Sequence, residues 1–205
     1  MGDYFDDINS MVIDVLKEIG NIGAGNAATA LAKMVNTKVD MTVPKVKILE
    51  FSEVPEMIGG EEMQVAGIFF KLSGDLNGSI MFVLDLDSAY SIIDLLMPRE
   101  VKELDEFTMS ALKEIGNILS GSYVSSLASL TNLKINISVP SLAVDMAGAV
   151  LSVPAIQFGL MGDKVLIIEN EFLEIEASKS TKGYFFLIPD EDSYDILLSS
   201  LGVSL

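Results

Sequence analysis

Cysteine and histidine are both absent from the 205 residues of this chain. Without cysteine the protein has neither disulfides nor thiolate chemistry, and without histidine it lacks an imidazole base and the usual ligands of a zinc site. A catalytic step through phosphohistidine or a cysteine nucleophile is therefore excluded. The lack of cysteine also fits a cytoplasmic protein, and we predict that location.

Basic residues are scarce as well. The chain has 13 lysines and arginines against 30 aspartates and glutamates, which gives a formal net charge of -17 and a pI of about 4.1. Such a surface repels phosphate backbones, so nucleic-acid binding is excluded as a function. The acidity either serves solubility alone or attracts a basic patch on a protein partner, and the composition leaves both interpretations open.

No hydrophobic run reaches the length needed to cross a membrane, although 50% of the residues are hydrophobic. The candidate runs at 80–84 and 165–168 have the size of strands. The N-terminus carries Asp3, Asp6 and Asp7 where a signal peptide would be basic. We therefore predict a soluble, intracellular protein with a sizeable core and no membrane insertion.

A seven-residue sequence, LKEIGNI, occurs twice. Residues 16–22 recur letter for letter as residues 112–118, an offset of 96 (114 − 18 = 96). The same offset holds at further identical pairs: Gly25 and Gly121, Leu31 and Leu127, Asn36 and Asn132, Pro44 and Pro140. Later in the chain Gly78 matches Gly183, an offset of 105 (183 − 78 = 105). The chain is therefore a duplication, and its second copy contains about nine extra residues between Pro140 and Gly183.

Each copy has the pattern of a helix, several strands and a closing helix. In the first copy we predict a helix at about 8–35, strands at 38–43 and 46–51, a hairpin of 65–72 with 78–84, and a helix to about 96 capped by Asp85 or Asp87. The second copy repeats this order from about residue 104, with another hairpin turn at 161–164. We therefore predict an α+β fold with internal pseudo-twofold symmetry, in which two tandem helix–strands–helix units share one core. Because one unit is small, we predict a single domain over 1–205, with repeat one at about 1–100 and repeat two at about 101–205.

Four residues of the first helix fall within one narrow arc, at about 100° per residue. They are Asp14, Glu18, Asn21 and Gly25, and we call them the first polar arc. The second copy holds Ser110, Glu114, Asn117 and Gly121 at the matching positions, and we call these the second polar arc. An apolar stripe lies opposite the first arc: Val12, Val15, Leu16, Ile19, Ile22 and Gly23. Both arcs are therefore expected to face water.

Two features favour a binding role for the arcs over an ordinary solvated helix face. Asparagine is unfavourable inside a helix, and the glycine of each arc costs roughly 1 kcal/mol relative to alanine. The glutamate and asparagine nevertheless occur in both copies, while neighbours such as Ala27 and Tyr123 differ. A glycine beside these side chains lets another molecule approach closely. Gly20 and Gly116, nearer the apolar stripe, are expected to serve tight helix packing.

Two other patterns point to cofactors, and we interpret both as structural. The glycine-rich segment 20–25 follows no strand, and its spacing differs from that of dinucleotide and P-loop fingerprints. Acidic residues at 85, 87 and 190–192 resemble metal ligands, but acids at the start of a helix are ordinary caps. We therefore predict no cofactor-binding or metal-binding site of the protein's own.

The duplicated Glu-x-x-Asn signature, on a long helix followed at fixed spacing by a strand ending in proline, resembles CheC-type chemotaxis phosphatases, the CheC/CheX/FliY family. The resemblance covers essentially the whole chain, including the two-copy layout. The CheX kind carries one such signature, and the FliY kind adds a C-terminal rotor domain for which no room remains after Leu205, so the CheC kind is nearest. The resemblance implies an enzyme that hydrolyses the aspartyl phosphate of the response regulator CheY, with Glu18, Asn21, Glu114 and Asn117 as catalytic residues. It also implies a second partner, the receptor deamidase CheD.

The chemistry that the resemblance implies needs no nucleophile from this chain. An aspartyl phosphate is already reactive, and the regulator brings Mg²⁺ and a lysine, so only a water has to be placed in line. An asparagine amide both donates and accepts hydrogen bonds and can orient that water, while the glutamate one turn earlier pairs with the regulator's lysine. The alternative is a non-catalytic interaction scaffold related to the middle domain of the flagellar switch protein FliM, which would have the same fold. The presence of both signatures favours the enzyme.

The segment after Pro140 is rich in small apolar residues, at 141–150. If it forms an exposed helix, it can imitate the alanine-rich helices that a receptor deamidase recognises, and Asp145 would then belong to the CheD-docking surface. In the alternative, 143–150 packs as a buried helix, because small residues are common inside proteins. Asp145 distinguishes these interpretations, since a lone acid in such a run is expected to point outward.

Overall fold

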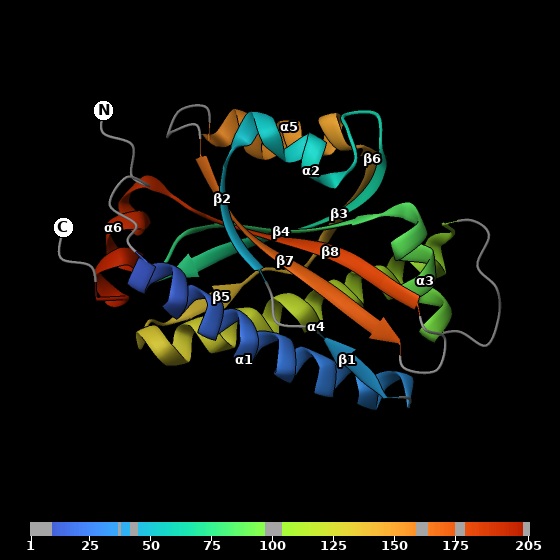
Figure 1. The fold of residues 1–205 in the computed structure, drawn as a ribbon, viewed down its shortest axis with the longest axis horizontal. Helices are drawn as coiled ribbons and strands as arrows, with labels where there is room; N and C mark the ends of the chain where they lie inside the picture. The colour runs from blue at the N-terminus through green and yellow to red at the C-terminus, as the bar shows by residue number, and fades with distance from the viewer. Residues whose placement is uncertain are drawn as a thin grey trace.

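The computed structural model describes residues 10–36, 38–41, 45–96, 104–158, 164–174 and 179–202. These residues form one eight-stranded sheet with helices on both of its faces (Figure 1). The first copy contributes α1 (Ser10–Val35), β1 (Val39–Met41), β2 (Lys45–Glu50), a 3-10 turn (Phe51–Glu53), α2 (Val54–Ile58), β3 (Gln64–Gly74), β4 (Gly78–Asp85) and α3 (Leu86–Leu96). The second copy contributes α4 (Glu106–Thr131), β5 (Ile135–Ile137), β6 (Ser141–Met146), α5 (Ala147–Phe158), β7 (Lys164–Glu174), β8 (Lys179–Pro189) and α6 (Glu191–Ser200).

The sheet interleaves strands of the two copies. β3 pairs with β4 and β7 pairs with β8, so each copy supplies one central hairpin, and the hairpins meet where β4 pairs with β8. The outer strands cross over, since β1 and β2 pair with β7 of the second copy while β5 and β6 pair with β3 of the first. Each copy therefore needs the other to complete its sheet. The predicted α+β fold with two related units and a shared core is confirmed, whereas the exchange of outer strands was not anticipated.

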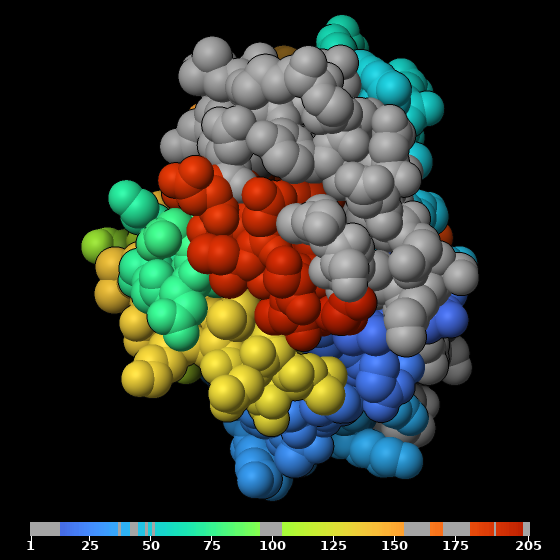
Figure 2. Space-filling model, turned by 90° about the vertical axis from the view of Figure 1, so that its left-hand side faces the viewer, coloured from blue at the N-terminus to red at the C-terminus, as the bar shows by residue number. Residues whose placement is uncertain are grey.

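Two hydrophobic clusters lie on the two faces of the sheet. α1 and α4 lie side by side on one face, where their buried residues join those of α3 and α6 in the larger cluster. α2 and α5 cover the other face over a smaller cluster (Figure 1). Figure 2 shows one end of the molecule, where α6 (red), the end of α4 (yellow) and α1 (blue) meet. No helix in the described ranges is long and apolar enough to cross a membrane.

The heptapeptide packs each long helix onto the sheet. Leu16 and Ile19 of α1 are 3% exposed, and the matching residues of α4 are fully buried. The prediction for Ile22 was wrong, because this residue of the expected apolar stripe is 38% exposed. The buried line of α1 runs through positions 16, 19, 23 and 27, a helical spacing that leaves Ile22 at its side. The side chain of Val12 lies outside the described residues.

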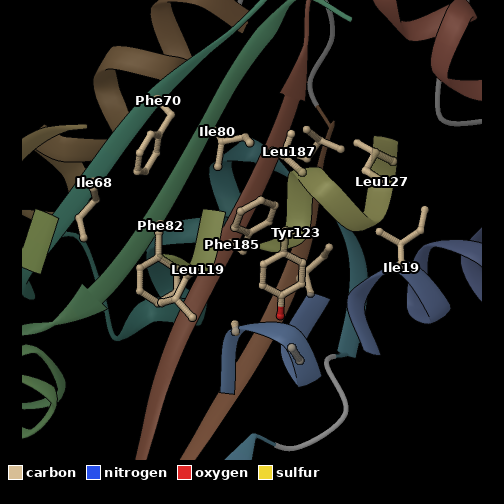
Figure 3. Packing of buried hydrophobic residues seen from close by; sticks show 14 of the residues in the cluster. Ile19, Ile68, Phe70, Ile80, Phe82, Leu119, Tyr123, Leu127, Phe185 and Leu187 are labelled. Carbon is tan, nitrogen blue, oxygen red and sulfur yellow. The ribbon is translucent and has the colours of Figure 1, made fainter. Parts of the chain in front are cut away.

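α1 and α4 approach each other closely at Gly23. A Cβ atom on Gly23 would lie 2.7 Å from Cδ1 of Tyr123, so a larger residue would collide with this ring. The ring cannot easily move, because it stacks on Phe185 with the ring centroids 4.6 Å apart (Figure 3). The contact fixes the two long helices, one from each copy, against each other and against β8.

Gly116 brings α4 equally close to the sheet. A Cβ atom on Gly116 would lie 2.7 Å from Cδ1 of Ile68 in β3. The predicted packing role of this glycine is therefore confirmed, and its counterpart Gly20 is also buried.

The first hairpin and its closing helix form as predicted. β3 and β4 pair in register from Leu72 with Gly78 to Val65 with Asp85. Asp85 then caps α3, since the backbone N–H and the hydroxyl of Ser88 both donate to its carboxylate at 2.7 Å. The predicted cap is therefore confirmed at Asp85, whereas Asp190 takes the N-cap position of α6 without a side-chain capping hydrogen bond, contrary to the prediction for the second copy.

The predicted hairpin turn at 161–164 is wrong. Residues 161–163 lie outside the described residues, but the element before them is helix α5 and the strand β7 begins at Lys164. The hairpin of the second copy is formed by β7 and β8 instead. The extra residues of the second copy lengthen two elements: α5 has 12 residues against five in α2, and β8 has 11 against eight in β4.

Candidate functional site

The two polar arcs lie on the outer faces of α1 and α4. Glu18 and Glu114 are exposed, as predicted. Asn21 and Asn117 were expected to be exposed as well, but both are half-buried. Each asparagine lies at the margin of its arc, about 60° around the helix from the glutamate, where the helix surface turns toward its neighbours. Each copy therefore holds a glutamate and an asparagine one turn apart, and the two pairs lie on separate helices.

Both arc glutamates are available to a partner. Within the described part of the chain, no hydrogen bond or ion pair engages the carboxylate of Glu18 or of Glu114. The neighbouring Lys17 pairs with Asp14 instead, with Nζ 3.5 Å from Oδ1. Both members of that pair are well exposed, so water screens their interaction. A cationic group of another molecule can therefore reach either glutamate.

The amide of Asn21 has an unsatisfied oxygen. In the described structure Oδ1 is covered by protein and accepts no hydrogen bond. Leaving a buried acceptor without a partner costs about 1–3 kcal/mol, so such atoms are rare in native proteins and tend to mark functional positions. A rotation of about 180° about the terminal torsion exchanges the oxygen and nitrogen of the amide, and no hydrogen bond to the oxygen opposes it. The group can thus present either a donor or an acceptor to a bound water.

The glycines of the arcs leave the helix surface bare. Apart from the adjoining residues and the backbone of its own helix, a Cβ atom built on Gly25 would have no described heavy atom within 4 Å, and one built on Gly121 would have Cδ1 of Ile137 at 4.0 Å. Packing therefore does not require glycine at either position. This openness agrees with the interpretation that the arc glycines permit close approach by another molecule.

A groove continues the first arc beyond Gly25. It has a volume of about 660 Å³ and runs between the second half of α1 and the strand β1. Its α1 wall includes Thr29 and Lys33, which follow Gly25 at intervals of four residues, and its β1 wall includes Asp40. This groove was not predicted from the sequence, although the spacing of four residues from Gly25 to Thr29 and Lys33 was a signal that extends the arc.

Among the residues that the structure describes, no group of three or more acidic side chains lies close enough together to hold a metal ion. The chain also has no cysteine or histidine. The groups at the arcs are thus carboxylates and amides, which can bind a cation and orient a water.

Asp145 lies on a strand and not on a helix, contrary to the prediction for 141–150. Residues 141–146 form β6 and pair with β3, with Asp145 opposite Val65, and helix α5 begins only at Ala147. The alternative of a buried helix at 143–150 is also wrong, because the end of β6 is exposed. Pairing with β3 satisfies the backbone of this segment, and that long-range contact outweighs its small-residue composition. Asp145 does point outward, as predicted, and accepts a hydrogen bond from the N–H of Met146 at 2.8 Å.

Comparisons with known proteins agree with the repeat. The model of the CheC-like family matches residues 11–48 and 107–144. The two matched segments are 96 residues apart (107 − 11 = 96), which is the offset of the duplication, and each contains one glutamate–asparagine pair. The family model therefore recognises both polar arcs.

Relatives match over most of the chain. The sequence is 38% identical to the CheY-P phosphatase CheC of Bacillus subtilis, over 98% of this chain and 99% of the relative. It is 34% identical to the flagellar motor switch phosphatase FliY of the same organism, over 66% of this chain and 36% of that protein. The crystal structure of FliY from Thermotoga maritima superposes with a TM-score of 0.75 at 28% identity, covering 95% of this chain and 98% of the other.

The same architecture occurs in more distant proteins. The FliM middle domain of H. pylori superposes with a TM-score of 0.69 at 12% identity, covering 94% of this chain and 99% of that domain. At this identity the likeness shows the fold alone. The full-length identity to CheC shows more, and the chain belongs to the CheC-like family.

Proposed function

We propose that this protein is a phosphatase that accelerates hydrolysis of the aspartyl phosphate on the response regulator CheY. The observation that carries the proposal is the same pair in both copies, an unpaired glutamate and an asparagine one turn away on an open helix face. The full-length similarity to the CheY-P phosphatase CheC supports the choice of substrate.

Asn21 and Asn117 orient the attacking water in this proposal. The side chain of an asparagine can accept a hydrogen bond from the water and donate one to a phosphoryl oxygen. Phosphoryl transfer depends mainly on positioning and on electrostatic stabilisation, so a water held in line with the leaving carboxylate is enough. Oδ1 of Asn21 is covered by protein but accepts no hydrogen bond in the described structure, so no hydrogen bond to it opposes the rotation that would turn it toward such a water.

Glu18 and Glu114 set the docking geometry. Each lies three residues before its asparagine, about 4.5 Å along the helix axis. A free carboxylate at this distance can form a charge-assisted hydrogen bond with a lysine beside the regulator's phosphorylation site. The Mg²⁺ ion that neutralises the phosphoryl oxygens belongs to the regulator, and this chain supplies no cofactor of its own.

A phosphate-release assay tests the proposal. Phosphorylated CheY is followed with and without the full-length protein, and we expect the protein to increase the rate. The alternative function, a scaffold like the FliM middle domain, predicts that the protein binds the regulator and leaves the rate unchanged. Binding without acceleration would therefore replace the phosphatase proposal by the scaffold.

We further propose that the protein binds the receptor deamidase CheD through the surface around Asp145. The exposed carboxylate of Asp145 stands at the junction of β6 and α5, between the exposed Val144 and Met146. Successive side chains of a strand point to opposite faces, so this strand end offers a charge contact on one face and apolar contacts on the other. The chain thus presents a strand end to CheD, and not the substrate-like helix that the sequence suggested.

Charge reversal tests this docking surface. Asp145→Lys is expected to weaken CheD binding by about tenfold or more and to leave phosphate release intact, because a charge pair becomes a repulsion. Asp195→Lys, at an exposed position on α6, makes the same change in net charge and serves as the control. Unchanged affinity of a folded Asp145→Lys protein would place the docking surface elsewhere.

A further inference from the structure

An aromatic side chain in the first turn of α4 is open to solvent. Phe107 is 67% exposed. Single exposed hydrophobic residues are common on protein surfaces, so exposure alone assigns no role. The position of Phe107 is more informative: it precedes Glu114 by seven residues, which is close to two helical turns and places both within about 20° of one face. Phe107 therefore extends the second polar arc toward the start of the helix.

The start of α4 is held rigidly. The N–H of Thr108 donates to Oδ1 of Asp105 at 2.8 Å, and the hydroxyl of Thr108 donates to Asp105 at 2.9 Å. Thr108 itself is fully buried. This cap fixes the backbone on both sides of Phe107, so its exposure does not arise from a frayed helix end. A rigidly presented aromatic ring loses little conformational entropy when a partner covers it.

Apolar residues continue the line that Phe107 begins. Ala111 and Ile118 follow at intervals of four and eleven residues, and both are half-buried against the larger core cluster. Helices that dock on a partner commonly present anchors at such spacing. The core already holds part of Ala111 and Ile118, whereas Phe107 has most of its surface left to enter another molecule.

We propose that Phe107 anchors the phosphorylated response regulator at the second copy. The inference rests on the proposed function, since a regulator whose aspartyl phosphate reaches Asn117 must cover the surface around it. An ordinary specific interface occupies about 800 Å² on each partner, a patch about 30 Å across. Phe107 lies ten residues from Asn117, about 15 Å along the helix axis, and falls within that patch. The ring enters an apolar depression on the regulator at that distance from its phosphorylation site, and a patch centred between Phe107 and Asn117 covers both residues.

The anchor distinguishes the second copy from the first. The residue that matches Phe107 in the first copy is Met11 (107 − 96 = 11). A rigid aromatic ring gives more binding energy than a flexible methionine at a specific contact. The second copy is therefore the tighter of the two docking sites for the regulator.

Steady-state phosphate release by the full-length protein tests the anchor. The measurements use Asn21→Ala as the parent, so that turnover runs through the second copy. Adding Phe107→Ala is expected to raise KM for the phosphorylated regulator about tenfold while kcat stays within about twofold, the pattern of lost uniform binding. Phe107→Leu, which keeps an apolar side chain, is expected to recover most of the loss.

Leu130→Ala is the matched control. Leu130 is 47% exposed on the same helix, but it lies about 160° around the axis from Glu114, so its truncation is expected to leave KM unchanged. A folded Phe107→Ala protein with unchanged KM, or with a reduced kcat at unchanged KM, would overturn the anchor. An inactive Asn21→Ala parent beside an active Asn117→Ala protein would also overturn it and leave the proposed function standing. If the wild-type protein does not accelerate phosphate release at all, the proposed function fails and the anchor fails with it.

Discussion

The two polar arcs share a glutamate and an asparagine but differ at their ends. In the first arc Asp14 adds a second carboxylate, which lies 3.5 Å from Lys17. In the second arc Ser110 takes this position, and its hydroxyl donates to the backbone of its own helix. Gly25 is exposed, whereas Gly121 is half-buried. The arcs therefore share the glutamate–asparagine pair, where we place the chemistry. They differ in charge at their first residue and in exposure at their glycine, two positions toward the edge of a docked partner.

The packed sides of the same helices differ in another way. Tyr123 of α4 corresponds to Ala27 of α1, and Ser120 corresponds to Ala24. The large ring of Tyr123 fills the space opposite Gly23. A small residue of the first copy is thus matched by a large residue of the second copy. Duplicated residues in the core thus diverged under the constraint of packing against each other. The glutamate of each arc is exposed and forms no hydrogen bond or ion pair within the described structure, so packing does not explain its identity in the two copies.

The largest effect is expected from removing both asparagines. Asn21→Ala combined with Asn117→Ala is expected to lower accelerated phosphate release by roughly a hundredfold or more, because no amide then orients the water. The free energy of unfolding should change by less than about 1 kcal/mol, since alanine favours the helix and Oδ1 of Asn21 has no hydrogen bond to lose in the described structure. Phosphate release is measured beside urea unfolding. A stable double variant with full activity would remove the asparagines from the mechanism.

Gly23 and Gly25 form a matched pair that separates packing from access. Gly23→Ala is expected to destabilise the protein by about 1–3 kcal/mol, because its Cβ would meet the stacked ring of Tyr123. Gly25→Ala is expected to stabilise it by about 0.5–1 kcal/mol, since the new methyl group enters open space and alanine favours the helix. Thermal unfolding of both variants measures the difference. Equal stabilities would contradict the close approach of α1 and α4 at Gly23.

A variant of Ser120 tests whether alanine, the residue at the matching position of the first copy, stabilises the protein more than serine does. Its hydroxyl is buried and has no hydrogen-bond partner among the residues that the structure describes. Ser120→Ala, which installs the residue found at Ala24, is expected to raise the free energy of unfolding by about 1 kcal/mol. Denaturant unfolding measures this change, and Ser126→Ala serves as the control because the hydroxyl of Ser126 donates to the carbonyl of Ser122 at 2.8 Å. A loss of stability in Ser120→Ala would mean that the hydroxyl is bonded in solution.

The smallest effect is expected from the single asparagine variants. The two arcs lie on separate helices, so Asn21→Ala and Asn117→Ala should each remove about half of the activity, and these two losses together account for the loss in the double variant. Phosphate release at a saturating concentration of the regulator measures both. Complete loss in one single variant would show that only one copy works as a site.

The order of elements and the location of the arcs could be predicted because both depend on local patterns. The helical spacing of Glu18 and Asn21 on α1, the apolar runs of β3 and β4 on either side of a short turn, and the Asp85 cap are each encoded within a few residues. Duplication strengthened every such prediction, since a pattern read in one copy had to hold in the other. The half-buried position of the asparagines was not predicted. A helical wheel shows on which side of the helix a residue lies, but not how far neighbouring side chains cover it.

By itself the sequence determined an acidic chain without thiol or imidazole chemistry, its duplication, and the glutamate–asparagine pair of each long helix. Only the tertiary structure decided that the outer strands exchange between copies, that 141–146 is a strand, and that Ile22 faces outward. The tertiary structure also decided that Gly25 stays open while Gly23 meets a ring from the other copy. The physical reason is the range of the interactions: helix periodicity and caps act within a few residues, whereas strand pairing and close packing join segments about 100 residues apart, whose choice of partner no local pattern records.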